Sequence, residues 1–295
     1  MASETSKAIY VNDGAQKWYD WHGRWSELIS YRYLLQNLII RDIKARYKNS
    51  LLGILWSLLN PLGLMAVFTI LFTVLSGEDA PRQYPVFILV ALMPWNFFRG
   101  AVTSGTMSIV SNTSLVKKVY FPRELLPLSS VLANLINFFF VFVVMIIFLF
   151  IFHLGLTIHA LWFPVILLTQ IIFTLGLVLI FSAITVFYRD VMQILDVGMT
   201  AWFFLTPIFY SFDFFSTSAE FLGIHFNPAQ VMRWLNPMAS IIDGYRTIFW
   251  GTDGSLGPVS MDPIFLLRTF ITSVIVLAVG YTVFMRLEYL FGERL

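Results

Sequence analysis

Residues 41–61 read RDIKARYKNSLLGILWSLLNP, and this stretch decides how the rest of the chain is interpreted. Its first part contains Arg41, Lys44, Arg46 and Lys48, and no further charge follows until Glu78. An abrupt change from a basic to a wholly apolar segment is typical of a chain that leaves the cytoplasmic headgroup layer and enters a bilayer. The stretch therefore predicts a basic, amphipathic interface helix that leads into a membrane-spanning helix.

The composition also indicates an integral membrane protein. The chain has 295 residues, of which 58% are hydrophobic and 12% charged, whereas soluble domains carry roughly twice that charged fraction. The net charge of +2 argues against nucleic acid as a partner. Cysteine is absent, which excludes disulfides and thiolate chemistry, and the four scattered histidines predict no metal site.

Six apolar segments predict an all-α protein with six transmembrane helices. We expect these spans at about 52–75, 86–110, 128–152, 162–187, 194–210 and 264–284. Residues 1–50 would form a cytoplasmic N-terminal arm followed by the interface helix, and residues 51–295 the transmembrane domain. The first 27 residues contain no apolar run of the kind that a cleavable signal peptide needs, so the N-terminus is expected to stay in the cytoplasm.

The positive charges fit this topology. With the N-terminus inside, the inner segments hold 14 of the 19 Lys and Arg residues, and the outer segments hold three, Arg82, Arg233 and Arg246. This asymmetry favours both termini on the cytoplasmic side. The two remaining arginines, Arg99 and Arg268, lie within predicted spans.

Arg99 falls near the middle of the second span, whose second half is rich in Gly, Ser and Thr. Such small residues favour close helix packing or a water-lined wall. A charge at mid-membrane costs roughly 2.5–3.5 kcal/mol even on lenient scales, so it needs a cavity or a partner. Two interpretations stay open: a pore-lining cation, or an arginine that pairs with helix-end carbonyls or lipid headgroups.

Several kinds of chemistry are missing from the sequence. The P-loop pattern for ATP binding does not occur, so ATP and magnesium are not expected on this chain. No Asp or Glu lies well inside a span, so ion-coupled transport lacks its usual residues, and a membrane-embedded transferase lacks its His or carboxylate cluster. The sequence therefore predicts a transport subunit and no enzyme.

Aromatic residues make up 17% of the chain and gather near the outer ends of spans one, two and five. Such residues usually face lipid or the protein core. An aromatic wall would also let a glycan slide, because sugar rings stack on aromatic faces. We expect glycan contact from Arg99 and from the aromatic residues Phe68, Phe72, Trp95, Phe98, Trp202, Phe209 and Tyr210. On this hypothesis alanine at Trp95 or Trp202 slows export without lowering membrane levels.

Four motifs occur in order along the chain. They are RYKNSLLGILWSLLNP at 46–61, FPRELLP at 121–127, YRDV at 188–191 and NPMASIIDGYR at 236–246. Together they resemble the transmembrane subunits of ABC-2-type exporters, especially those of O-antigen, capsule or teichoic acid. The likeness extends over about residues 28–290.

The resemblance implies a homodimer that encloses a channel, with two copies of a separate ABC ATPase on the cytoplasmic side. The cargo would be a lipid-linked polysaccharide that leaves across the bacterial cytoplasmic membrane, with its headgroup near Arg99 or the basic interface helix. Teichoic acid, a small lipid or a drug remain alternative cargoes within the family.

The resemblance also implies roles for individual residues. Arg41, Asp42 and Arg46 would touch the ATPase, and residues 112–124 would form a coupling helix, which could otherwise be an ordinary positive-inside loop. Residues 228–250 would form two re-entrant outer gate helices, since irregular backbone is tolerated when protein buries it. The coupling residues are Lys117, Lys118, Tyr120, Arg123 and Glu124, and the outer gate residues are Trp234, Asp243, Tyr245 and Arg246.

Overall fold

The computed structural model describes residues 27–48, 50, 52–53, 55–76, 81–210, 219–221, 224–226, 228–252, 255 and 257–295. The arm expected at residues 1–24 lies outside the described residues.

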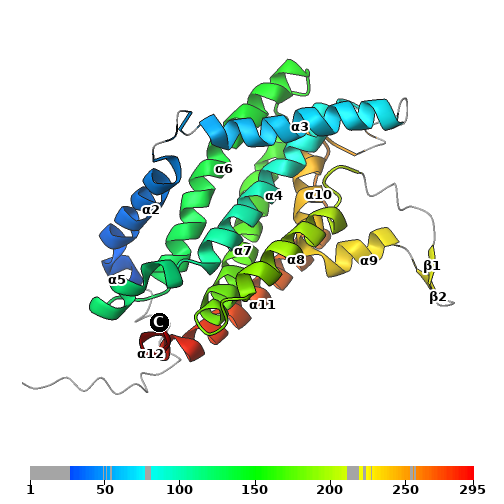
Figure 1. Ribbon diagram of the computed structural model, residues 1–295. Helices are drawn as coiled ribbons and strands as arrows, with labels where there is room; N and C mark the ends of the chain where they lie inside the picture. Colours follow the sequence, from blue (N-terminus) through cyan, green and yellow to red (C-terminus); the bar gives the residue numbers. More distant parts are fainter. Residues whose placement is uncertain are drawn as a thin grey trace, which may run out of the picture.

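The described chain is a bundle of long helices with one small hairpin (Figure 1). The elements are α2 (Arg32–Tyr47), α3 (Leu55–Ser76), α4 (Tyr84–Thr106), η2 (Val110–Asn112), α5 (Thr113–Lys118), α6 (Leu125–Ile151), η3 (Ile158–Trp162), α7 (Phe163–Thr185), α8 (Val191–Leu205), β1 (Ala219–Phe221), β2 (Ile224–Phe226), α9 (Pro228–Leu235), α10 (Pro237–Phe249), α11 (Pro263–Glu288) and α12 (Phe291–Arg294). The hairpin, in which β1 and β2 pair antiparallel, was not expected.

The predicted all-α membrane fold is confirmed. Among the described residues, five helical segments are long and apolar enough to cross a membrane, namely α3, α4, α6, α7 together with η3, and α11. The remaining expected span, the fifth in chain order at about 194–210, corresponds to α8, which has only 15 residues. It ends at Leu205, before the expected limit near residue 210, because Thr206 is extended and precedes Pro207; a residue before proline is disfavoured in a helix. A sixth crossing therefore stays a prediction.

Helix α4 lies at the centre of the bundle. It packs against α6 and α7, with α3, α8 and α10 around it. Every residue from Val86 to Trp95 is buried. The small residues of its second half allow close contact, as expected: a Cβ added to Gly100 would lie 2.7 Å from the Asn134 side-chain oxygen on α6.

Helices α7 and α11 make the most extensive helix pair. They cross at Gly176 and Gly280, where a Cβ on Gly280 would overlap the Gly176 carbonyl oxygen and one on Gly176 would lie 2.7 Å from the Leu277 backbone nitrogen. Glycine at both positions lets the two backbones touch, as in other membrane helix pairs.

The expected division of residues 228–250 into two helices is confirmed. Helix α9 begins at Pro228 and α10 at Pro237, because proline fits the first turn of a helix. The Asn236 side chain accepts a hydrogen bond from the Ala239 amide at 3.2 Å and so caps α10. Helix α10 is buried among α4, α7 and α11, whereas α9 projects from the bundle (Figure 1).

Helix α2, the expected interface helix, lies along α6. Leu38 is buried, but Tyr33 and Ile40 are exposed, so its apolar residues are not confined to one face. The amphipathic stripe expected from the sequence is thus only partly present. Apolar side chains that the protein leaves uncovered are suited to contact with lipid when a helix lies at the membrane surface.

Candidate functional site

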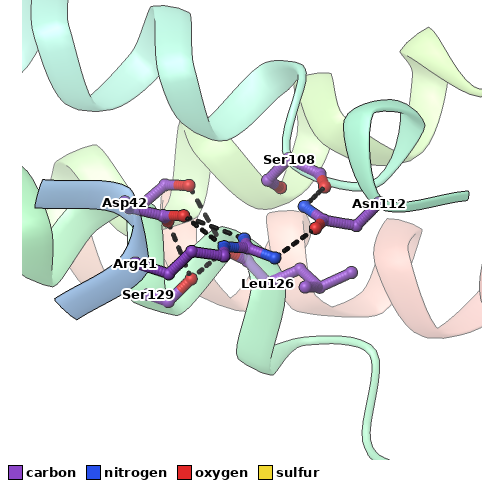
Figure 2. A network of polar contacts seen from close by, with 7 residues as sticks. Arg41, Asp42, Ser108, Asn112, Leu126 and Ser129 are labelled. Carbon is purple, nitrogen blue, oxygen red and sulfur yellow. Dashed lines mark hydrogen bonds and ion pairs between the residues drawn. The ribbon is translucent and has the colours of Figure 1, made fainter. Parts of the chain in front are cut away.

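The candidate functional residues include a polar network at the interface helix, an open cavity between α2, α3, α4 and α6, and aromatic clusters near α8. The network joins α2 to the segment after α4 (Figure 2). One guanidinium nitrogen of Arg41 donates to the Asn112 side-chain oxygen at 2.6 Å, and another pairs with Asp42 at 2.8 Å. The Asn112 amide donates onward to the Ser108 carbonyl at 2.7 Å.

Helix α6 completes the network. The Ser129 hydroxyl lies 3.4 Å from the second Asp42 oxygen and donates to the Leu126 carbonyl at 2.9 Å (Figure 2). The expected ATPase-contacting residues Arg41 and Asp42 therefore also connect α2, η2 and α6.

The segment expected to form the coupling helix has an anchored side and a free side. The anchored side is buried at Val116 and Phe121 in a small apolar core shared with α2, α6, α7, α11 and α12. Arg123 donates to the Glu288 carbonyl and lies 5.9 Å from the Phe291 ring centre, and Glu124 is buried at the start of α6. The free side presents the exposed residues Lys117, Lys118, Val119 and Tyr120.

The segment is also not one continuous helix. It consists of η2, the short helix α5, and residues that turn extended at Val119. Helix α5 is only six residues long and ends at Lys118, next to the extended Val119, so the single coupling helix expected over residues 112–124 is not present.

A cavity of about 720 Å³ opens between α2, α3, α4 and α6. Its polar lining includes the two arginines Arg46 and Arg99 and the carboxamides of Asn60, Asn96, Asn134 and Asn137. Apolar side chains, among them Leu64, Met93 and Val141, form the rest of its wall. The cavity thus combines hydrogen-bond donors with an apolar surface.

Hydrogen bonds hold the carboxamides of the cavity in place. The Tyr47 hydroxyl donates to the Asn137 side-chain oxygen at 2.8 Å, which ties the end of α2 to α6. The Asn134 amide donates to the Ser104 hydroxyl at 2.8 Å and to the Ser130 carbonyl at 2.7 Å. The cavity wall is therefore fixed jointly by α2, α4 and α6.

Arg99 lines this cavity from α4 and also reaches α8. One of its guanidinium nitrogens lies 3.2 Å from Asp196, and the two side chains are 44% and 72% exposed. Both interpretations of Arg99 anticipated part of this arrangement: it faces a cavity, and it has a partner. The partner is a carboxylate, where helix-end carbonyls or headgroups were considered.

The aromatic residues of spans one, two and five meet, as their positions suggested. Phe68 on α3 stacks on Phe209 with ring centres 5.7 Å apart, and Phe72 stacks on Tyr84 of α4 at 5.3 Å. Phe209 also lies 4.9 Å from the Tyr210 ring. The cluster joins α3, α4 and the end of α8, and its role in glycan contact stays a prediction.

Trp95, Phe98 and Trp202 form the deeper part of the aromatic region. Trp95 and Phe98 are buried, and Phe98 lies edge-on to Trp202 at 5.2 Å. The Trp202 indole donates to the Asn236 side-chain oxygen at 2.8 Å. A glycan could reach Trp95 or Phe98 only if α8 moved away from α4.

The four expected gate residues occupy different environments. Tyr245 is buried and donates to the Gln170 side-chain oxygen at 2.9 Å. Arg246 is buried too, donates to the carbonyls of Pro207, Ile208 and Tyr210, and lies 3.7 Å from the centre of the Phe87 ring. Arg246 therefore fixes the chain that leaves α8, because its donors satisfy three backbone carbonyls in the interior.

Trp234 and Asp243 lie nearer the surface. Trp234 is exposed, and the Arg268 guanidinium lies 4.5 Å from its ring centre. Asp243 pairs with Arg233 at 3.5 Å, which links α9 to α10. The gating role of all four residues is untested by these contacts and stays a prediction.

Sequence reasoning did not single out Asn112, Ser129, Asn137 or Asp196 as functional. A carboxamide inside an apolar span is itself a signal, since polar groups in membrane helices usually find a partner. That signal identifies Asn134 and Asn137 as interior residues, but it does not name their partners.

Comparison with known proteins gives consistent matches. A family model described as ABC-2 type transporter matches residues 33–250. An O-antigen export system permease protein RfbA from Myxococcus xanthus is 38% identical over 224 residues, which are 76% of this chain and 83% of that protein. A protein of the same name from Klebsiella pneumoniae is 32% identical over 267 residues, 89% of this chain and 96% of that protein.

Proposed function

Because the chain belongs to the ABC-2 type transporter family, we propose that it is the membrane subunit of an ATP-driven exporter of a lipid-linked polysaccharide of the O-antigen class. The chain is a multi-pass membrane protein and a transport subunit. The observation on which the proposal rests is the similarity to O-antigen export permeases over most of both chains. Transport would run outward across the bacterial cytoplasmic membrane.

ATP and magnesium would be bound by two copies of a separate ABC ATPase. Two copies of this chain would enclose the channel, with both termini on the cytoplasmic side. The exposed face of α3 supports the homodimer, since only 6% of this span is fully buried within its own chain. The network of Arg41, Asp42 and Asn112 supports mechanical coupling, because it joins the two elements expected to touch the ATPase.

Deletion of the chain in its source bacterium tests the cargo. Surface polysaccharide should disappear while the lipid-linked polymer accumulates inside the cell, and re-expression should restore the surface polymer. Mass spectrometry of lipid retained by the purified complex identifies the cargo directly. Retention of a teichoic acid, a small lipid or a drug in place of a glycan-bearing lipid would contradict the proposal.

Tyr120→Ala tests the coupling segment. Tyr120 is 74% exposed, and exposed aromatic residues that a partner buries often contribute 2 kcal/mol or more to binding. We expect the substitution to weaken association with the ATPase by about tenfold or more and to lower export, without loss of folding. Arg123→Ala and Glu124→Ala would not separate loss of ATPase contact from loss of local structure, because both residues also anchor the segment.

Tyr289→Ala is the matched control for this experiment. Tyr289 is 73% exposed and lies outside the coupling segment, after the end of α11. Its substitution should leave association and export unchanged. Wild-type association and export in Tyr120→Ala would show that residues 117–120 do not contact the ATPase.

A further inference from the structure

The cavity between α2, α3, α4 and α6 has the electrostatic character of an anion site. Two guanidinium groups, from Arg46 and Arg99, reach it together with four carboxamides, and none of its described lining residues is acidic. Within the described part of the chain Arg46 forms no ion pair, and Arg99 pairs only with Asp196, which lies outside the lining. The positive charge of the cavity is therefore only partly neutralised.

A second, independent feature indicates that a ligand is expected there. Asn137 is 92% buried, since its relative exposure is 8%, and it lines the cavity. Its oxygen accepts from Tyr47, but its amide nitrogen has no hydrogen-bond partner among the described residues. Buried donors are almost always paired. The Asn137 nitrogen is enclosed, so it would need a small side-chain rotation to meet an acceptor of a ligand in the cavity.

The size and the walls of the cavity indicate what kind of anion fits. Its volume of about 720 Å³ is within the range of small-molecule sites, roughly 300–1,000 Å³, and is far larger than a free phosphate needs. Leu64, Met93, Phe97 and Val141 give it apolar walls beside the polar groups. Guanidinium groups bind phosphate oxygens through paired hydrogen bonds. A phosphate headgroup that continues into an apolar chain matches both kinds of surface.

We infer that this cavity binds the phosphate-bearing headgroup of a long-chain lipid, and that Asp196 competes with the headgroup for Arg99. The natural ligand, a lipid-linked glycan, rests on the proposed function. When the phosphate binds, Arg99 turns its donors from the carboxylate to the phosphate, and Arg46 and the carboxamides contribute further hydrogen bonds. No covalent bond changes in this exchange.

Competition from the Asp196 carboxylate would help a transporter to release the headgroup. A ligand that crosses a membrane protein must bind well enough to be accepted and weakly enough to be released. Asp196 lies 3.2 Å from Arg99, so a bound phosphate is close to a second negative charge, which lowers its affinity. The exchange also breaks the ion pair between α4 and α8, while their aromatic contacts, such as that of Phe98 with Trp202, remain.

Binding to the full-length chain, purified with its ATPase in phosphatidylcholine nanodiscs without ATP, tests the inference. The probe is farnesyl diphosphate, compared with farnesol and with inorganic diphosphate. Farnesyl diphosphate should bind more tightly than either. Equal binding of farnesol would show a plain lipid groove, and equal binding of inorganic diphosphate a free-anion site; both results overturn the inference.

Opposite effects of two substitutions distinguish this exchange from a purely structural ion pair. Arg99→Gln should weaken farnesyl diphosphate binding about tenfold or more, because a charge-assisted hydrogen bond is lost. Asp196→Asn should tighten it about threefold, since the competing charge is removed. A structural ion pair predicts that both substitutions change binding in the same direction, and that result, or no change in either variant, overturns the inference.

Two further variants keep the test decisive. Arg46→Gln should weaken binding like Arg99→Gln and provides the result if Arg99→Gln fails to fold. Arg189→Gln removes an exposed arginine outside the cavity and should leave binding unchanged. Binding and export are measured separately. If the unsubstituted chain binds farnesyl diphosphate but exports no polysaccharide, only the proposed function is rejected. If export is normal and Arg99→Gln and Arg46→Gln leave binding unaltered, only this site is rejected.

Discussion

Helices α3 and α4 both have the length and composition of a membrane span, yet they occupy opposite environments. The mean hydropathy of α3 is 1.9 and that of α4 is 1.5, while 6% of α3 and 78% of α4 are buried inside the chain. The more apolar helix is thus the more exposed one (Figure 1). In a bilayer this is reasonable, because lipid tails are as apolar as leucine and hydrophobicity does not drive a helix to the interior.

Small residues explain the close packing of the second half of α4, although its first half is buried with bulky side chains. Helix α4 has Gly100, Ser104 and Gly105 where it meets its neighbours, so other helices approach its backbone closely. Helix α3 directs the bulky residues Val67, Ile70 and Val74 outward. Small residues let neighbouring helices approach the second half of α4, whereas the outward bulky residues of α3 are available to lipid or to a second subunit.

The largest effect on stability is expected from a comparison of alanine substitutions at two tryptophans. Trp95 on α4 is 1% exposed and Trp56 on α3 is 55% exposed. Trp95→Ala should destabilise the protein by about 3 kcal/mol, near the lower end of the range for buried aromatic residues, because the surrounding helices cannot fully close the void. Thermal unfolding of the purified chain and its level in membranes measure this loss.

Trp56→Ala is the control and should leave both measurements nearly unchanged. Because Trp95 is buried, we now expect its alanine variant to lower membrane levels too; whether it slows export, as expected from the sequence, stays a prediction. Equal stability of the two variants would mean that α4 is not the packed centre of the fold.

The second comparison uses two glycines. A Cβ added to Gly105 on α4 would overlap the Val178 side chain on α7, whereas one added to Gly63 on α3 meets nothing within 4 Å. Gly105→Leu should cost about 1–3 kcal/mol through overpacking, and Gly63→Leu should not lower the stability of the single chain. Unfolding in detergent measures both, and a Gly63→Leu loss as large as that of Gly105→Leu would contradict the contrast.

Local signals allowed most of the fold to be predicted. The hydropathy of the spans and the prolines at 228 and 237 act within a few residues, and the helices begin close to where these signals place them. The candidate site depends on contacts between distant residues. Arg41 meets Asn112 across 71 positions, and Arg99 meets Asp196 across 97. Hydropathy does not specify which helices are neighbours, so these pairs could not be derived from it.

The same limit explains the gate residues. The sequence shows that Tyr245 and Arg246 lie on a short helix after Asn236-Pro237, which is confirmed. Their burial depends on α10 packing against α4 and α7. An arginine deep in the interior is tolerated here because the carbonyls after α8 accept hydrogen bonds from it, and that arrangement exists only after the chain has folded.

The smallest expected effect concerns what covers α3. The chain has no cysteine, so one introduced cysteine cannot form a disulfide within its own chain, and a crosslinked species of twice the chain's mass identifies pairing with a second copy. We expect Ile70→Cys to leave stability unchanged and to give a crosslinked dimer on mild oxidation in native membranes. A disulfide requires Cα atoms within about 7 Å, so the crosslink would place α3 against its own copy.

Ile275→Cys on α11 is the control, because Ile275 is also exposed and apolar but lies on another helix. It should remain monomeric under the same oxidation. If Ile275→Cys forms the dimer and neither Ile70→Cys nor its neighbours Val67→Cys and Val74→Cys do, then lipid covers α3. The contrast between α3 and α4 would then separate lipid-facing from interior helices, and α11 would form the subunit interface in place of α3.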